Sequence, residues 1–163
     1  MKVEQIVQQE YKSQTLIMDT AYQTAAVAMV AKLLGFTPIR ASIRPGESAI
    51  DFEPGESLPW QTAVIVKLAG GCGLRKWTGE TLKDFGPDED RLAARRMVER
   101  ATPDADAADA EFKILDARAA HLVETNWKAI GCFAMHLLEE ENLKFEALEG
   151  ALDEMLAHAK TLN

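Results

Sequence analysis

The residues of this chain that could do chemistry are few, and their spacing forms no familiar catalytic pattern. His121, His136 and His158 all fall in the C-terminal third of the chain. A zinc site needs three or four nitrogen, sulfur or oxygen ligands that converge. No HxxxH pair and no CxxC pair occurs in the chain, so surface or half-buried histidines are the simplest interpretation of these three residues.

Cys72 is the second candidate, because a cysteine in a loop can act as a nucleophile where a base lies nearby. The surrounding sequence supplies no base, so an inert thiol is favoured. The glycine-rich stretch "AGGCGLRKWTG" fits neither GxGxxG nor GxxxxGK[ST], and it therefore does not indicate a phosphate-binding loop. The acidic cluster at residues 88–90 is explained by the start of a helix, and the one at 139–141 by a solvated helix end.

The third candidate is a polar patch at the start of the most apolar helical segment, "DTAYQTAAVAMVAKLLGF". Alanine, valine, methionine and leucine recur there at helical spacing, and Gly35 stands where a helix would end. Gln23 and Val27 are four residues apart, so they share one face of the helix. A glutamine and a valine are a poor pair for any chemistry, so this patch requires another explanation.

Composition limits the class of protein. The chain has 163 residues and a formal net charge of −8, which disfavours binding to nucleic acids and to anionic membranes. Cys72 and Cys132 predict free thiols in a reducing compartment. The longest apolar run is too short to span a bilayer, and the first residues, "MKVEQIVQQEYK", contain no signal-peptide core. We therefore expect a soluble, cytoplasmic protein without membrane insertion.

The elements that must position these residues are predicted by hydrophobic periodicity and turn residues. We expect one domain over residues 1–163, mostly helical with a small β-hairpin or sheet. Alternating residues and the turn residues of "RPGES" predict the hairpin within 37–53. The next helix is expected to be capped by Ser57 and to end at Gly70 and Gly71. A loop is expected to follow at 72–86. The other helices are predicted at residues 3–11, 15–34, 87–101, 112–138 (as two helices or one bent one) and 145–158, with 102–112 as a linker or helix start.

Taken in order, these segments resemble the peptidase domain of FtsH-type, ATP-dependent zinc metalloproteases. "TAYQTAAVAMVA" is similar to the family's "AYHEAGHAVVA" helix, and "ASIRPGESA" to its "TIIPRG" strand and turn. "VIVKLAGGCGLRKWTGE" is similar to "ILLAGRAAEELFFGE", and "DEDRLAARRMV" to the "NDLERATEIARRMV" helix of the third metal ligand. The likeness covers about residues 15–155 in the same order. It implies a metal-helix half with a small sheet at 15–101 and a C-terminal helical bundle at 109–160, without the family's ATPase module and membrane anchor.

The resemblance explains the polar patch. It implies that Gln23 and Val27 stand at the first and second histidines of the zinc-binding HExxH motif, and Thr24 at its glutamate. Asp90, or else Asp88, falls on the third ligand, and the family's buried glutamate falls on Leu74. Valine cannot bind a metal, a glutamine amide is a poor zinc ligand, and threonine cannot replace a carboxylate base. The resemblance therefore implies neither bound zinc nor protease activity. A hydrogen bond from the Gln23 amide to Asp90 is expected in place of the metal bond.

A domain that has lost its chemistry is expected to act by binding a protein or peptide partner. In the resembled family the strand beside the metal helix pairs with extended substrates, which implies β-augmentation at Ala41, Ser42, Ile43 and Arg44. Because that family forms rings, a homo-oligomer is also expected. Two alternatives remain: a hydrolase that rebuilt its site from Cys72 or the C-terminal histidines with Asp90, and a small-molecule pocket in the vacated metal cavity near Thr24 and Val27.

Overall fold

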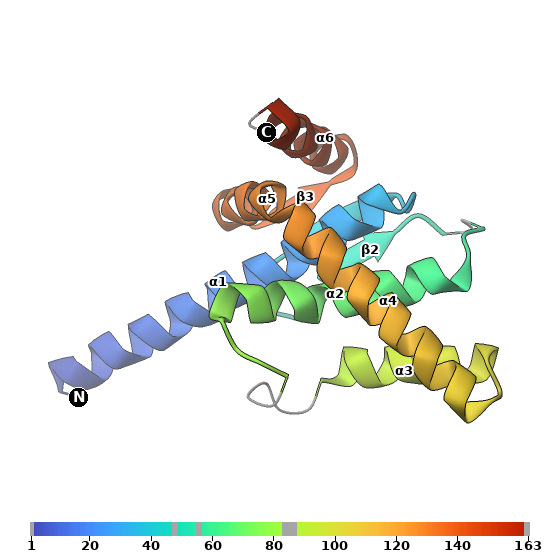
Figure 1. The fold of residues 1–163 in the computed structure, drawn as a ribbon. Coiled ribbons are helices and arrows are strands. Elements are labelled where there is room, and N and C mark those ends of the chain that lie inside the picture. The colour runs from blue at the N-terminus through green and yellow to red at the C-terminus, as the bar shows by residue number, and fades with distance from the viewer. Residues whose placement is uncertain (1, 47–48, 55–56, 83–87, 162–163) are drawn as a thin grey trace.

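The computed structural model describes residues 2–46, 49–54, 57–82 and 88–161, and these residues form a mostly helical protein with a small antiparallel sheet (Figure 1). The predicted fold class is therefore confirmed at this level, while the metallopeptidase-like fold stays a prediction. The helices are α1 (Val3–Leu33), α2 (Trp60–Thr78), α3 (Glu89–Ala101), α4 (Ala105–Thr125), α5 (Trp127–Glu140) and α6 (Phe145–Thr161). The strands are β1 (Pro38–Ser42), β2 (Ile50–Phe52) and β3 (Asn142–Lys144).

Helix α1 is one continuous helix of 31 residues, whereas two helices were predicted over the same stretch. The prediction was wrong at this point because the polar residues 12–14 interrupt the apolar pattern without containing a glycine or proline that would break a helix. Residues 2–17 are exposed and project from the body of the protein, while most residues from Ala21 to Ala31 are buried (Figure 1). The second half of α1 is therefore the central helix of the core.

Helix α2 continues through Gly70 and Gly71, so the predicted end at this pair and the predicted loop from Cys72 onward are wrong up to Thr78. The helix ends at Gly79, which has a φ of 74° and donates its N–H to the carbonyl of Arg75 at 2.8 Å. Gly70 and Gly73 allow α1 to pack closely against α2, and this packing outweighs the low helix propensity of glycine. Residues 83–87 of the predicted loop lie outside the described residues.

Side-chain caps define the starts of α3 and α4. The Asp88 carboxylate accepts a hydrogen bond from the N–H of Arg91 at 3.0 Å, and Asp104 accepts from Asp106 and Ala107. The acidic start predicted for α3 is confirmed, although Pro87 lies outside the described residues. The acidic, alanine-rich stretch at 102–112 contains the first turns of α4, and α4 and α5 are two helices that meet at Asn126.

The sheet has the strand order β2-β1-β3, with both pairs antiparallel. The β1–β2 hairpin was predicted and is confirmed, although residues 47–48 of its "RPGES" turn lie outside the described residues. Strand β3 was not predicted, and it places Leu143 opposite Ala41 on the other side of β1. β1 is therefore the central strand, and β2 is an edge strand.

The core is one cluster of buried side chains to which both predicted parts of the chain contribute. Met29 and Ile65 come from α1 and α2, and Phe133 and Leu148 come from α5 and α6. A stack of Tyr22 on Trp77, with ring centroids 4.1 Å apart, ties α1 to α2 at the margin of this core. No helix within the described ranges is long and apolar enough to span a membrane.

Candidate functional site

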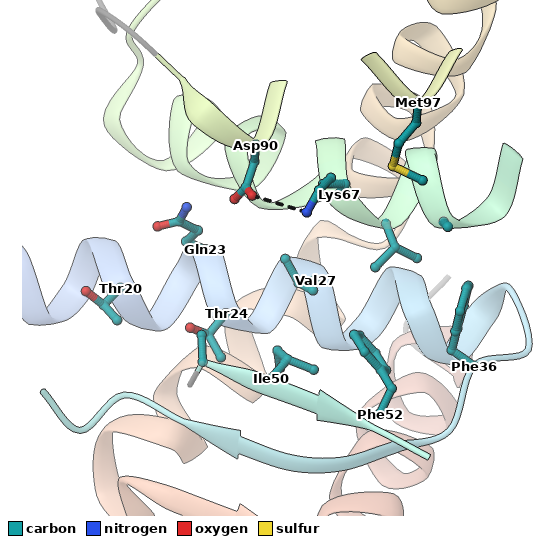
Figure 2. A pocket seen from close by; sticks show the side chains of 13 residues that line it. Thr20, Gln23, Thr24, Val27, Phe36, Ile50, Phe52, Lys67, Asp90 and Met97 are labelled. Carbon is teal, nitrogen blue, oxygen red and sulfur yellow. Dashed lines mark ion pairs between the residues drawn. The ribbon is translucent and has the colours of Figure 1, made fainter. Parts of the chain in front are cut away.

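A cavity of about 500 Å³ lies between the second half of α1, strand β2 and helices α2 and α3 (Figure 2). Gln23, Thr24, Val27 and Asp90, the four positions that the resemblance aligns with the metal site, all line this cavity. The other lining residues are Thr20, Phe36, Ala49, Ile50, Phe52, Ala63, Val66, Lys67 and Met97. The structure thus brings together the candidate residues of α1 and the candidate carboxylate of α3.

One face of α1 forms a wall of the cavity. Thr20, Gln23, Thr24 and Val27 follow the spacing i, i+3, i+4 and i+7, which places them on a single stripe of an α-helix. Gly70 lies against this stripe, since a Cβ atom there would be only 3.0 Å from Cγ2 of Val27. The cavity wall therefore depends on the close packing of α1 on α2.

The structure distinguishes between the two candidate carboxylates of α3. Asp90 lines the cavity, whereas Asp88 does not and instead caps α3, with its Oδ2 atom 3.8 Å from Nη1 of Arg75. Among the two alternatives, Asp90 is therefore the residue that shares a site with Gln23. Leu74, at the position of the family's buried glutamate, is half-buried on α2 and does not line the cavity.

Asp90 forms an ion pair with Lys67 rather than the expected hydrogen bond with Gln23. The Lys67 Nζ atom lies 3.6 Å from Oδ1 of Asp90, and the two side chains are 38% and 57% exposed, respectively. The Gln23 side chain rises toward Asp90 (Figure 2), yet it makes no hydrogen bond within the part of the chain that the structure describes. The expectation was wrong because the Asp90 carboxylate is hydrated and paired with a lysine, so burial does not force it to bind an amide.

The cavity residues do not fit a zinc ion. They offer one carboxylate that already pairs with Lys67, a neutral amide and two hydroxyls, whereas zinc sites use cysteine, histidine and carboxylate ligands. Across residues 2–46, 49–54, 57–82 and 88–161, no three His, Cys, Asp or Glu side chains gather closely enough to hold a metal ion. The donor set therefore provides no route to metal-dependent hydrolysis in this cavity.

The hydroxyl of Thr24 is the unusual polar group of the site. Thr24 is only 2% exposed, and its hydroxyl forms no hydrogen bond with any described residue. By contrast, the Thr20 hydroxyl, on the same face of α1, donates to the carbonyl of Leu16 at 2.8 Å. The Thr24 hydroxyl oxygen is not among the described buried side-chain atoms that lack a hydrogen-bond partner, so it keeps contact with the cavity that the residue lines. It can therefore donate to or accept from a ligand group there.

The opposite end of the cavity is apolar. Phe36 and Phe52 pack with ring centroids 5.6 Å apart, and Val66 and Met97 line the same cavity from α2 and α3. An apolar cavity with a few polar groups at one end is the usual form of a ligand site. The arrangement therefore suits a ligand that has both an apolar and a hydrogen-bonding part.

The other reactive side chains lie outside this cavity. His121 and His158 are exposed and His136 is half-buried, and none of them lines the cavity. Cys72 is buried beside Arg75, and burial raises the pKa of its thiol above the ordinary value, so the reactive thiolate is disfavoured. No described histidine or cysteine joins Asp90 at the cavity, so the geometry gives the relocated hydrolase no support.

Sequence reasoning missed Lys67, Ile50, Phe52 and Met97 as parts of the site. Lys67 carried a usable signal, because it is the only charged residue from Trp60 to Leu74 in an otherwise apolar helical segment. The others are ordinary apolar residues, and their presence at the cavity depends on how β2 and α3 pack against α1.

The fold and site thus define a mostly helical protein in which an edge strand borders an amphipathic cavity. A scan against models of known protein families gives no match, and no curated protein matches the chain.

Proposed function

We propose that this protein is an FtsH-peptidase-like domain without protease activity that binds an extended peptide segment of a partner protein along β2. Two features support the relationship to that family: the co-linear sequence segments, and the location of Gln23, Thr24, Val27 and Asp90 on one cavity. The replaced ligands and base support the loss of hydrolysis. The expected homo-oligomer stays a prediction.

The strand expected to accept the peptide must be corrected. Ala41 pairs with Ile50 on one side and with Leu143 on the other, and the N–H of Ile43 donates to the carbonyl of Glu141 at 2.9 Å. Ser42 pairs with Asn142 on one side and donates its N–H to the carbonyl of Ala49 on the other. The N–H of Arg44 donates to the Ser42 hydroxyl. Because β1 has neighbours on both sides, Ala41 and Ser42 have no free edge for β-augmentation.

The two outer strands are β2 and β3, and among the described residues β2 pairs only with β1. β2 is the outer strand whose residues line the cavity, and this observation carries the proposal. The carbonyl of Ala49 accepts from Ser42, and the N–H of Glu53 donates to Thr37, so both residues direct these backbone groups toward β1. Since the direction alternates along an antiparallel strand, the backbone groups of Ile50 and Phe52 face the open edge. The side chains of the same two residues line the cavity (Figure 2). A strand added to β2 would therefore lie along the cavity.

The test begins with a phage-displayed library of random 12-residue peptides, selected on the immobilised protein. Selected peptides are then labelled, and their dissociation constants are measured by fluorescence anisotropy. Ile50→Pro removes an N–H that faces the open edge, and proline is tolerated at such positions of edge strands. We expect the affinity of this variant for the peptide to be about tenfold lower or more, because a main-chain hydrogen bond is lost and the proline ring changes the strand edge.

Ile50→Ala is the matched control, because it shortens the same side chain and keeps the N–H. It should lose less affinity than Ile50→Pro, and circular dichroism should show that both variants remain folded. A second control uses selected peptides that are N-methylated at single residues. Affinity should fall at alternate positions only, because alternate N–H groups of an added strand face β2. Failure to select any peptide, or equal affinity of wild type and Ile50→Pro, would overturn the proposal.

Binding of a free small molecule is a second candidate, favoured by the size of the cavity and the unpaired Thr24 hydroxyl. Fragment screening by ligand-observed NMR tests it. A small molecule that enters the cavity without using β2 should bind wild type and Ile50→Pro equally well, whereas a peptide should not.

A further inference from the structure

The cavity has two chemically different ends beside the same two residues of β2. Figure 2 shows Thr24 close to Ile50 at one end and Phe36 close to Phe52 at the other. Ile50 and Phe52 are two residues apart, so their side chains project from one face at a separation of about 6.7 Å. A peptide strand paired with β2, as the proposed function requires, would place its own side chains i and i+2 over the cavity at the same spacing.

The end next to Thr24 favours an uncharged side chain that forms hydrogen bonds. The Thr24 hydroxyl can donate and accept, and it makes no hydrogen bond with any described residue. Gln23, which is half-buried, adds a side-chain amide that likewise makes no hydrogen bond with a described residue. The nearby charges of Lys67 and Asp90 offset each other at 3.6 Å. A charged ligand group would therefore lose hydration without gaining an unpaired counter-charge.

The end next to Phe52 favours a large apolar side chain. Phe36, Phe52 and Met97 lie at this end (Figure 2), and none of them has a polar side-chain atom other than the thioether of Met97. The thioether side chain of a methionine adapts to aromatic and aliphatic groups alike. A polar side chain here would be desolvated without a partner, whereas phenylalanine, leucine or methionine would bury apolar surface.

We infer that the site reads a three-residue pattern in the bound strand: an uncharged hydrogen-bonding residue (Ser, Thr, Asn or Gln) and a large apolar residue, separated by one residue of any type. The first residue pairs with the Thr24 hydroxyl and the Gln23 amide, and the second fills the space between Phe36, Phe52 and Met97. The intervening side chain points away from the cavity, because successive side chains of a strand alternate between faces. This inference rests on the proposed peptide-binding function.

The test uses synthetic variants of one selected peptide, with affinity measured by fluorescence anisotropy on the full chain. Replacing the polar residue by alanine should weaken binding several-fold, and replacing it by aspartate or lysine should weaken it further. Replacing the large apolar residue by alanine should weaken binding about tenfold or more. Replacing the residue between them should leave the affinity within about twofold of the parent peptide's.

A matched pair of protein variants isolates the Thr24 hydroxyl. Thr24→Val keeps the shape of the side chain and removes the hydroxyl, so the serine and alanine peptides should then bind equally well. Thr20→Val is the control, because the Thr20 hydroxyl lines the same cavity but is already bonded to Leu16. It should preserve the difference between the two peptides.

The two proposals fail in different ways. If binding is lost in Ile50→Pro but the affinity does not depend on the two peptide positions, peptide binding at β2 stands and the three-residue pattern is wrong. A preference for aspartate or lysine at the first position, or a serine-to-alanine difference that persists in Thr24→Val, also overturns the pattern. If no peptide binds at all, both the pattern and the proposed function are wrong.

Discussion

Replacing Gly73 by alanine would measure how closely α1 and α2 must approach each other. A Cβ atom at Gly73 would lie 2.5 Å from Cβ of Ala26 and 3.3 Å from the carbonyl oxygen of Tyr22. Carbon atoms in contact prefer about 3.5–4.0 Å, so the two helices would have to separate locally by about 1 Å. Tyr22 and Ala26 are neighbours of Gln23 and Val27 on α1, so this separation would also displace a wall of the cavity.

The expected change in stability is the sum of two opposing terms. Alanine is the better helix former, by about 1 kcal/mol in a helix interior. Inserting a methyl group into a packed interface typically costs about 1–3 kcal/mol, and here the contact is with another helix rather than with a flexible side-chain end. Because the 2.5 Å contact is so short, the cost is expected in the upper half of this range, about 2–3 kcal/mol. Less the helix-propensity gain, Gly73→Ala should lower the free energy of unfolding by about 1–2 kcal/mol, which corresponds to a melting temperature about 2–8 °C lower for a domain of this size.

Gly150→Ala is the matched control. Gly150 lies on the exposed side of α6, and a Cβ atom there would have no atom within 4 Å. The same chemical change should therefore raise the free energy of unfolding by about 0.5–1 kcal/mol. Urea unfolding followed by circular dichroism measures both variants. If Gly73→Ala is as stable as the wild type or more stable, the close approach of α1 and α2 at this glycine is refuted.

Four further predictions concern the face of α1 that the resemblance aligns with the HExxH motif, the cysteines and the projecting half of α1. The triple variant Gln23→His, Thr24→Glu and Val27→His should bind about one zinc ion per chain with the help of Asp90, while the wild type should carry less than about a tenth, as measured by elemental mass spectrometry; a triple variant without zinc would contradict the alignment with the HExxH motif. In native protein at pH 8, the exposed Cys132 should be the one thiol per chain that reacts rapidly with a disulfide reagent. Cys72 should react only after unfolding, because burial raises the pKa of its thiol. Two rapidly reacting thiols would contradict this. Since the folded state holds the Cys72 proton more tightly than the unfolded state, the stability that this group contributes is present below the ordinary thiol pKa and is lost as the pH rises above about 9, so Cys72→Ala should flatten the alkaline fall in stability. Hydrogen exchange should be fast over residues 3–15, because an isolated helix of this length is marginal in water, and slow over the buried segment from Ala21 to Ala31; equal protection of the two segments would show that the projecting half is covered in solution.

Sequence patterns were most informative where the physical cause is local. Apolar residues at helical spacing predicted the second half of α1, α5 and α6, because each helix must bury one face. Alternation predicted the β1–β2 hairpin, and the acidic residues before Arg91 predicted the start of α3. The unusual pairing of Gln23 with Val27 also drew attention to the face of α1 that proves to line the cavity.

Tertiary packing decided what these local signals could not. Gly70 and Gly71 favour a helix end in isolation. In the structure Gly70 lies against Val27 of α1 and Gly71 against Asp88 and Arg75, and both are in the middle of α2. The short strand β3 has little local signal and forms because residues about 100 positions away in sequence complete its hydrogen bonds. Its pairing with β1 covers the edge of Ala41 and Ser42 that β2 does not, so β2 and β3 are the outer strands of the sheet.

The sequence by itself therefore determined a mostly helical chain, a hairpin and a helix face whose residues cannot hold zinc, since these depend on the identity and spacing of neighbouring residues. Only the tertiary structure decided which carboxylate joins that face, that Lys67 pairs with it, and that Ile50 and Phe52 border the cavity. The physical reason is that hydrophobic periodicity specifies which face of an element is buried, but not which other element covers it. The cavity and its open strand edge exist because α1, α2, α3 and β2 pack around one another.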